Sequence, residues 1–399
     1  MKYPIGIQSF EAIITDGYAY VDKTALIYQM VSTGQIYFLS RPRRFGKSLL
    51  VDTLACYFNG RKDLFAGLAI DALEKDWKKY PVFRVDFNGG NYEEEDSLEK
   101  TIEWSIYQWE EQYGLEHQTE ELTLGDRFKE VLRRAHEQTG ERCVVLIDEY
   151  DKPLLDVLDT GARTSSAVRG QLQPVEEKHR NTLKAFYSCF KAANNDLRFV
   201  LLTGVTKFSQ VSVFSGFNQP KDISMSRDYD ALCGITTDEL HSVFAEPIAS
   251  LAEARGCTVE EMKQMLKLNY DGYHFSEQMT DIYNPFSILN VLDNQQLRDY
   301  WFSTGTPTYL IRLMNHSRVQ MNELAGKYYD ASMFIDYKAD VEQPLPMIFQ
   351  SGYLTIKDYQ PRTERYLLDF PNNEVRKGFL SLVAANYLKT KEPAEDPDC

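Results

Sequence analysis

The stretch "SRPRRFGKSLL", residues 40–50, decides the fold. It follows the apolar run "IYFL" (residues 36–39), which is typical of a short buried strand, and it leads into a helical pattern that opens at Gly46. The triplet "GKS" (residues 46–48) matches the second half of the pattern GxxxxGK[ST], in which backbone amides and a helix N-terminus converge on phosphate oxygens. A strand, a loop and a helix therefore stand in the order that a phosphate-binding loop requires.

The first half of that pattern is different, because Arg41 stands where the pattern has a glycine. Glycine would permit a tight turn, whereas Arg41-Pro42 must start the loop with a more extended backbone. A basic loop that binds nucleic acid is the competing interpretation of "RPRR". A second, independent element has to decide between the two.

That element is "VVLIDEYD", residues 144–151, a continuous apolar run that ends in carboxylates. Such a run indicates a parallel strand that is buried on both faces. An aspartate at the end of the strand, Asp148, can hold Mg²⁺ together with Ser48, and the adjacent Glu149 can polarise an attacking water. The sequence therefore favours phosphate chemistry.

A third strand, "LRFVLLTG" (residues 197–204), repeats this form, and its Thr203 is positioned to sense a γ-phosphate by a hydrogen bond. A fourth is "YPVFRVDFN" (residues 80–88), which is bounded by proline and by Asn-Gly-Gly. Strands that alternate with helices predict an α/β sheet.

The segments "SRPRRFGKS", "VLIDEYDKP", "LLTGVTKFS" and "YNPFSILN" together resemble the AAA-ATPase-like family of bacterial proteins. The resemblance covers nearly the whole chain. In that family RPRRFGKS is the usual form of the Walker A motif, so Arg41 is a family trait, and the acidic strand end is the Walker B motif. The resemblance implies a P-loop NTPase of the additional-strand class, close to AAA+ and STAND ATPases, with a mainly parallel sheet sandwiched by helices.

The resemblance also implies ATP binding and Mg²⁺-dependent hydrolysis that drives a conformational switch or motor. Lys47 would contact the β- and γ-phosphates, Ser48 and Asp148 the Mg²⁺, Glu149 the water and Thr203 the γ-phosphate. The residues expected to surround the nucleotide are Arg43, Arg44, Phe45, Gly46, Lys47, Ser48 and Leu49. The candidates for an arginine finger are Arg43, Arg44, Arg163, Arg169 and Arg227.

Two or three domains are expected in a chain of 399 residues, and the patterns along the chain favour a division into three. Residues 1–235 would form the ATPase domain and residues 236–295 a helical lid. Residues 296–399 would form a mixed α/β region, with a winged-helix-like fold as one option, and a linker. Relatives often carry a C-terminal PD-(D/E)xK nuclease domain, but the ExK triplets at 176–178 and 261–263 lie in helical patterns, so we expect no nuclease activity.

The net charge of −15 argues against broad adhesion to DNA or to an anionic membrane. A nucleic-acid-binding module without turnover, gripping a backbone through Arg41, Arg43 and Arg44, is the alternative function. A protein or nucleic-acid partner of the C-terminal region and a homo-oligomer stay open. The sequence shows no zinc-ligand spacing, no signal peptide and no membrane span, so the cytoplasm is the expected location.

Other segments carry weaker signals. The acidic stretch 92–121 is helical in pattern and is expected to be a solvated insertion. Residues 159–174, rich in small and polar residues, are expected to form a mobile loop. Asp22 is expected to cap the first helix. We expect the side chains of Lys23 and Lys207 to be solvated, and His274 to be a packing residue.

Overall fold

A five-stranded parallel sheet forms the centre of the protein in the computed structural model, which describes residues 1–117, 122–168, 171–208, 220–303, 308–316, 323–336 and 343–389. The strand order is β2-β3-β6-β1-β7, and every neighbouring pair is parallel. The strands are β1 (Ile36–Ser40), β2 (Val82–Asp86), β3 (Cys143–Asp148), β6 (Leu197–Gly204) and β7 (Lys221–Asp222). Since β6 lies between β1 and β3, the sheet has the extra strand that the additional-strand class implies.

The burial of the two central strands explains why they are continuous apolar runs. All six residues of β3 and seven of the eight residues of β6 are buried. Strands of a parallel sheet are covered by helices on both faces, so alternation between polar and apolar residues is lost. The four strands predicted from the sequence are all present.

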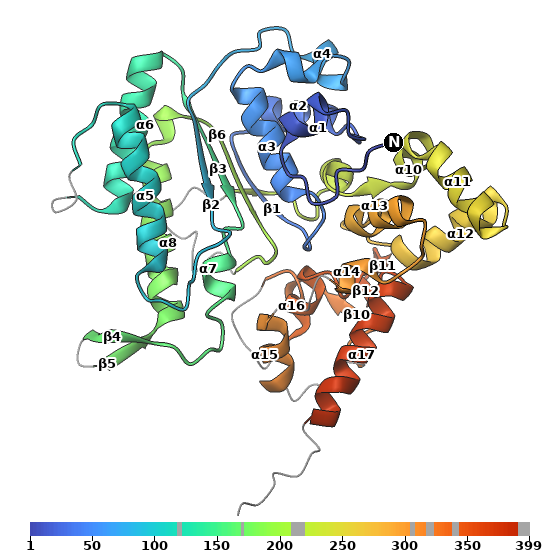
Figure 1. Cartoon of the computed structure of the whole chain (residues 1–399). Coiled ribbons are helices and arrows are strands. Elements are labelled where there is room, and N and C mark those ends of the chain that lie inside the picture. Colours follow the sequence, from blue (N-terminus) through green and yellow to red (C-terminus); the bar gives the residue numbers. More distant parts are fainter. Residues whose placement is uncertain are drawn as a thin grey trace, which may run out of the picture.

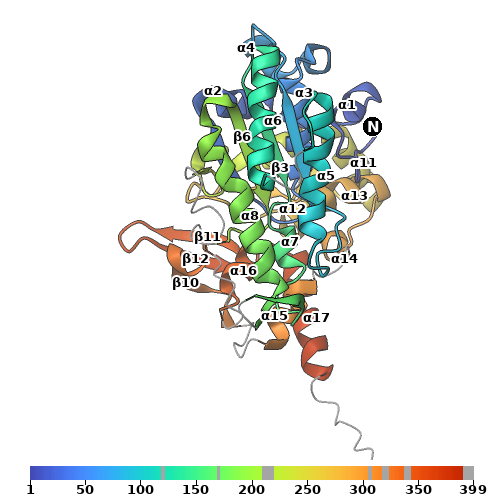
Figure 2. The same cartoon turned by 90° about the vertical axis from the view of Figure 1, so that its left-hand side faces the viewer.

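Helices cover both faces of the sheet (Figures 1 and 2). One face carries α5 (Ser97–Gln112), α6 (Leu124–Thr139) and α8 (Val175–Ala192). The other face carries α1 (Phe10–Thr15), α2 (Thr24–Thr33), α3 (Lys47–Phe58) and α4 (Ala69–Leu73). The predicted α/β class is therefore confirmed.

Two of the predictions for connecting segments were wrong. Within the stretch expected to be a solvated insertion, α5 buries Leu98, Ile102 and Ile106 and packs against α6 and α8. Its apolar residues recur every four positions, and the many acids on its other face hid that stripe. The stretch expected to be a mobile loop contains an antiparallel hairpin of β4 (Arg163–Val168) and β5 (Gln171–Pro174). The expectation was wrong because it rested on the composition of the stretch, which does not show that two strands pair.

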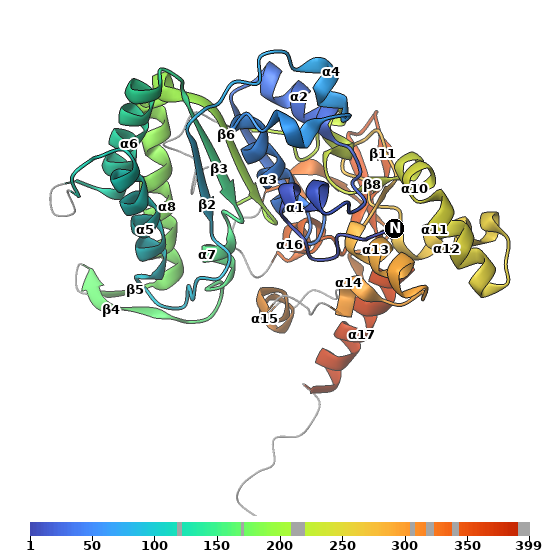
Figure 3. The same ribbon diagram turned by 45° about the horizontal axis from the view of Figure 1, so that its top comes forward.

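Beyond the sheet lie four helices with a small core of their own, which we call the lid helices (Figure 3). They are α10 (Thr237–Val243), α11 (Ala245–Arg255), α12 (Val259–Tyr270) and α13 (Pro285–Asn294), joined to the rest by the short pair β8 (Ile235–Thr236) and β9 (Ile282–Tyr283). Thr236 and Glu239 form a complete capping box at the start of α10.

The elements from α14 to α17, which we call the C-terminal unit, lie below the end of the sheet at which α7 (Lys152–Leu155) begins (Figure 1). This is the carboxyl edge of the parallel strands, because α7 follows β3. The unit contains a three-stranded antiparallel sheet of order β10-β12-β11. Its elements are α14 (Tyr300–Ser303), α15 (Thr308–His316), β10 (Lys327–Asp330), α16 (Leu345–Gln350), β11 (Thr355–Gln360), β12 (Arg365–Asp369) and α17 (Asn373–Lys389).

None of the described helices is both long enough and apolar enough to cross a membrane. The expected tail and linker fall mostly on residues 390–399, which lie outside the described residues.

Candidate nucleotide site

The loop between β1 and α3 combines two backbone conformations that turn its amides inward. Arg44 has a φ of 68° and Gly46, the N-cap of α3, a φ of 90°. A positive φ is uncommon for a residue other than glycine. Alternation of this kind forms a concavity lined by N–H groups, and the first turn of α3 adds amides that no carbonyl of the helix accepts. The loop therefore has the form of an anion cradle.

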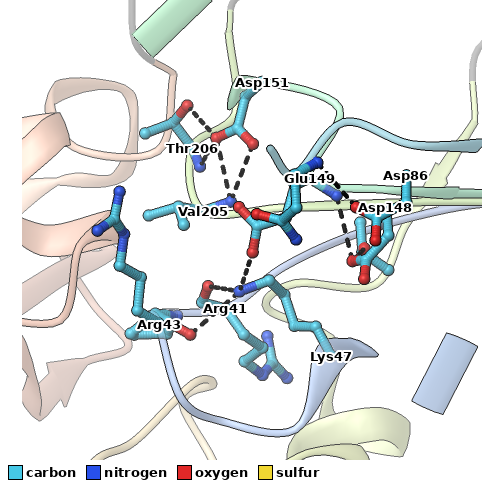
Figure 4. A network of polar contacts seen from close by, with 12 residues as sticks. Arg41, Arg43, Lys47, Asp86, Asp148, Glu149, Asp151, Val205 and Thr206 are labelled. Atoms are coloured by element: carbon cyan, nitrogen blue, oxygen red, sulfur yellow. Dashed lines mark hydrogen bonds and ion pairs between the residues drawn. The ribbon is translucent and has the colours of Figure 1, made fainter. Parts of the chain in front are cut away.

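Lys47 fills the middle of this loop with its ammonium group (Figure 4). Only 4% of its side chain is exposed, and Nζ donates to the carbonyls of Arg41 at 3.0 Å and Pro42 at 3.2 Å. Glu149 Oε1 lies 3.7 Å from the same nitrogen. The lysine is thus held inside the loop by weak partners that a phosphate can replace.

Asp148 lies fully buried at the carboxyl end of β3, two strands away from the loop. Its Oδ1 accepts hydrogen bonds from Thr203 Oγ1 at 2.6 Å and from the Glu149 amide at 3.1 Å. Its Oδ2 has no hydrogen-bond partner among the described residues. A buried carboxylate oxygen without a partner is costly, so the site suits a cation or a cation-bound water.

Glu149 adopts a left-handed backbone with a φ of 53°. Such a conformation is strained for a residue with a side chain, and it is common at active sites. It places the carboxylate toward Lys47 while the backbone continues into α7 (Figure 4). The structure therefore brings Lys47, Asp148, Glu149 and Thr203 to one edge of the sheet.

Arg41 does not belong to this cradle. It is 1% exposed, its guanidinium lies 4.0 Å from the centre of the Phe275 ring, and it donates to the carbonyls of Ser40, Ser224 and Tyr229. Burial lowers its pKa, against the charges of nearby acids. A group in this position cannot grip a nucleic-acid backbone, so that part of the alternative function is corrected.

Arg43 and Arg44 also have partners outside the loop. The Arg43 guanidinium lies 5.6 Å from the centre of the Tyr309 ring, and Arg44 lies 5.0 Å from that of Phe286. Arg44 is exposed and Arg43 half-buried. Both guanidinium groups therefore lie against aromatic rings of other elements.

Phe45 anchors the loop through its side chain. Its ring is 1% exposed and packs edge-on against Tyr273 and Phe275 at 4.8 and 5.4 Å. Its carbonyl accepts the amide of Gly234 at 3.1 Å. Its side chain and that of Leu49, which is half-buried on α3, both line a cavity beside Gly46.

The remaining finger candidates are placed differently. Arg163 lies in the β4–β5 hairpin and donates to the carbonyl of Leu172, and Arg227 pairs with Glu277. Arg169 lies outside the described residues. Neither Arg163 nor Arg227 contacts the loop as the protein stands.

Two lysines expected to be solvated are largely buried. Lys23 has a side chain that is 10% exposed and pairs with Glu239 at 2.5 Å. Lys207 is 12% exposed and pairs with Asp222 at 2.9 Å and Asp336 at 3.1 Å. Glu239 lies 216 residues from Lys23, and Asp336 is also far from Lys207 in the sequence, so neither pairing is readable from local sequence. Asp222 is close to Lys207 in the sequence, but no local pattern marks the two as partners. Asp22 is not the N-cap of α2, which is Lys23, but it lies one residue earlier and accepts the amide of Thr24 in the first turn of that helix.

A cavity of about 100 Å³ lies beside Gly46, and no motif in the sequence indicated it. It is mainly apolar and lies between the N-terminal segment, α3 and the start of the lid helices. Residues of these three parts that line it include Tyr20, Val21, Leu49, Cys233, Ile235 and Leu289. A flat apolar group attached to a phosphate in the loop would meet this cavity.

Two further carboxylates at this edge also escaped the sequence-based search. Asp86 ends β2 in register with Asp148. Partial burial, then the neighbouring carboxylates, raise the pKa of Asp86. Asp151, the last residue of the motif "DEYD", is fully buried. The repeated acid in that motif was the available signal.

Comparisons with known proteins place the chain in a family. The chain matches the family model "Predicted AAA-ATPase" over residues 4–214. It is 37% identical over 397 residues to a protein of Azotobacter chroococcum mcd 1 described as an uncharacterized protein in the vnfD 5′ region, with 98% of this chain and 71% of that protein covered.

Two solved structures are more remote. The Aeropyrum pernix ORC1 protein in complex with DNA shares 10% identity at a TM-score of 0.31, with 96% of this chain and 98% of that chain covered. The Aeropyrum pernix ORC2 protein in ADPNP-ADP complexes shares 11% identity at 0.31, with 92% of each covered. A TM-score this low carries no argument about this chain.

Three features define a P-loop NTPase fold: the strand order, the loop that leads from β1 into the N-terminus of α3, and the acidic residue that ends β3. The chain belongs to the Predicted AAA-ATPase family.

Proposed function

We propose that the protein binds ATP with Mg²⁺ at the loop of residues 41–48 and hydrolyses it. The observation that supports this most directly is that Lys47 and the Asp148–Glu149 pair share one edge of the sheet, with Glu149 3.7 Å from the lysine. Phosphoryl transfer depends mainly on positioning and on neutralising charge, and these residues supply both.

Binding begins with the phosphates. The Lys47 ammonium exchanges its two carbonyl partners for phosphate oxygens, which form stronger, charge-assisted hydrogen bonds. Amides of residues 44–49 complete the cradle, and Pro42 has no amide to contribute. Glu149 then loses its lysine partner and becomes free to orient a water.

The metal fits the residues present. Ser48 and Asp148 would hold it, since Asp148 Oδ2 is buried without a partner. When bound, Mg²⁺ supplies charge neutralisation for the phosphates. Thr203 keeps Oδ1 of Asp148 engaged at 2.6 Å, which orients the carboxylate.

The nucleobase would occupy the cavity beside Gly46. Its walls belong to the N-terminal segment, to α3 and to the start of the lid helices, so an occupant contacts all three. The ion pair of Lys23 and Glu239 already ties the first of these parts to the lid helices. Nucleotide would therefore stabilise one arrangement of the lid helices over others, which is the basis of a conformational switch.

A nucleic-acid module without turnover is the weaker alternative. Arg41 is buried, and Arg43 and Arg44 are engaged with aromatic rings. Its remaining support is the exposed position of Arg44 and a partner that the C-terminal unit could hold.

The deciding experiment compares wild type with Glu149→Gln. We expect the variant to bind ATP with an affinity within about threefold of wild type, and to hydrolyse it slower by about 10²-fold or more, because the amide is no base. The matched control is Glu177→Gln, an exposed glutamate of α8, which should leave turnover unchanged. Equal turnover in Glu149→Gln and wild type would remove Glu149 from the mechanism, and absence of turnover in wild type would remove the proposed function.

A further inference from the structure

Asp151 is a fully buried carboxylate beside the site, and the groups that bond it belong to the segment that follows another strand, β6. Its oxygens accept the amide of Val205 at 3.0 Å, the amide of Thr206 at 2.6 Å and the hydroxyl of Thr206 at 2.7 Å (Figure 4). Val205 and Thr206 directly follow β6, whereas Asp151 follows β3. The carboxylate therefore joins the two segments that carry Glu149 and Thr203.

Tyr150 joins the same two segments from the other side. Its amide donates to the carbonyl of Thr203 at 2.9 Å and its hydroxyl to the carbonyl of Thr206 at 2.9 Å. The amide of Phe208 donates to the Tyr150 hydroxyl at 3.1 Å. Both residues after Glu149 are thus bonded to the segment after Thr203.

There is no free space between the segments. A Cβ atom on Gly204 would lie 2.5 Å from Asp151 Oδ1 and 2.7 Å from a ring carbon of Tyr150. Since neither segment can slide past the other, a displacement of one must move both.

The charge of Asp151 requires these donors. Burial raises the pKa of Asp151 to about 6, and the charge of Glu149 acts in the same direction, while the bonds from Thr206 oppose them. An ionised carboxylate in a buried place is costly unless several donors satisfy it. An amide side chain has only one acceptor oxygen and would turn its own N–H groups toward backbone N–H groups.

A further hydrogen bond links the segment after β6 to the C-terminal unit. Lys207 follows Thr206, and its amide donates to Gln350 Oε1 at the end of α16 at 2.7 Å. The side-chain nitrogen Nε2 of Gln350 donates in turn to the backbone carbonyl of Phe334 at 3.1 Å. Movement of the β6 end is therefore transmitted directly to α16.

We propose that Asp151 is a positioning residue of the hydrolysis step, which fixes the spacing of Glu149 and Thr203 and links both to the C-terminal unit. It does not touch nucleotide; it acts through the backbone of residues 203–207. The proposal rests on the proposed ATPase function.

The test is Asp151→Asn, measured by steady-state ATP hydrolysis and, separately, by binding of a fluorescent ATP analogue. We expect kcat to fall by roughly 10²-fold, as for a displaced catalytic group, with KM and the dissociation constant within about threefold of wild type. A residue with a merely structural role would change binding and turnover together. The matched control is Asp156→Asn, at the opposite end of α7, where the side chain pairs with Lys152, and it should leave kcat unchanged.

Thr206→Val provides the second measurement, because Asp151→Asn may abolish folding. It removes one bond to the carboxylate and keeps the size of the side chain, so kcat should fall by about 3- to 10-fold at unchanged KM. A wild type that hydrolyses ATP together with an Asp151→Asn variant of equal kcat overturns the positioning role alone. If Asp151→Asn does not fold, a Thr206→Val variant with wild-type kcat overturns it. A wild type without turnover overturns the proposed function instead.

Discussion

The indole nitrogen of Trp301 donates a hydrogen bond of 3.2 Å to the backbone carbonyl of Arg43. Trp301 belongs to α14 and Arg43 to the loop before α3, so the C-terminal unit binds the backbone of the phosphate loop itself. Gly352 also lies close to the loop, because a Cβ at its position would come within 2.7 Å of the Pro42 side chain. The position of the C-terminal unit and the shape of the loop are therefore coupled.

The close approach of Gly352 to Pro42 predicts an unequal cost for two similar substitutions. Gly352 and Gly326 have φ values of 88° and 73°, so alanine at either position meets similar backbone strain of about 1–2 kcal/mol. A Cβ on Gly352 would also lie 2.7 Å from the Pro42 Cβ, whereas one on Gly326 meets nothing within 4 Å. Gly352→Ala should therefore lower the free energy of unfolding by about 1–3 kcal/mol more than Gly326→Ala, by urea denaturation. Equal losses would mean that the unit does not press on the loop.

The part of the site that lies on strands could be predicted from the sequence. A parallel strand that is buried on both faces must be a continuous apolar run, and its first polar residue marks the carboxyl edge. Asp148 and Thr203 were found in this way. Lys47 was found because a helix N-terminus next to a strand end is a local pattern.

The part that depends on distant pairing could not be predicted. Arg41 reads as one basic residue among three, and only its packing on Phe275 and its bonds to Ser224 and Tyr229 separate it from the other two. The same holds for Lys23, whose partner lies 216 residues away. The hydrogen bonds from Val205 and Thr206 to Asp151 form because β6 lies beside β3, and the order of strands in a sheet is not encoded in any short segment.

The cradle geometry predicts that two neighbouring cations have different effects on nucleotide. Lys47→Ala removes the buried ammonium and should weaken ATP binding by about 10- to 100-fold, since a hydrogen bond to a charged group is worth roughly 1.5–3 kcal/mol. Arg44→Ala removes an exposed side chain that lies on Phe286, and should change the affinity by less than about threefold.

The same pair of variants separates ATP binding from nucleic-acid binding. A module that grips a backbone would lose oligonucleotide affinity on Arg44→Ala, with a shallower dependence on salt, and would be indifferent to Lys47→Ala. Titration of both variants with a fluorescent ATP analogue and with a labelled oligonucleotide distinguishes the two functions.

If the cavity beside Gly46 holds the nucleobase, filling the cavity should weaken the binding of ATP and leave the binding of the phosphates alone unchanged. Val21 lines the cavity and is half-buried, so Val21→Trp should place a ring inside it. We expect ATP affinity to fall by about tenfold or more, and the affinity for inorganic tripolyphosphate to stay within about threefold, as competition calorimetry would show. Val243→Trp, at a half-buried position on α10 away from the cavity lining, is the control. A parallel loss for both ligands would place the base elsewhere.

Glu374 predicts how stability changes with pH. It is 1% exposed in the first turn of α17, and it accepts the amide of Trp301 at 2.6 Å and the hydroxyl of Ser287 at 2.8 Å. Burial raises the pKa of Glu374 from 4.5 to about 7, while both of these bonds act against the rise. Between pH 4.5 and pH 7 the folded protein keeps a proton on Glu374 that the unfolded chain has released. The contribution of Glu374 to the free energy of unfolding is therefore complete below about pH 4.5 and is lost as the pH rises through 7.

The substitution Glu374→Gln should remove this dependence, because glutamine stays neutral and keeps an oxygen for the Trp301 amide. At pH 5 the two proteins should unfold at similar urea concentrations. At pH 8 the variant should be more stable, by up to about 3 kcal/mol, which is the free energy of keeping that carboxylate ionised in the folded state. Glu253→Gln, at an exposed position on α11, should shift neither value. If the free energy of unfolding changes between pH 5 and pH 8 by the same amount in Glu374→Gln and in wild type, Glu374 does not cause the pH dependence. The carboxylate that contacts Trp301 would then already be ionised at neutral pH in the folded protein.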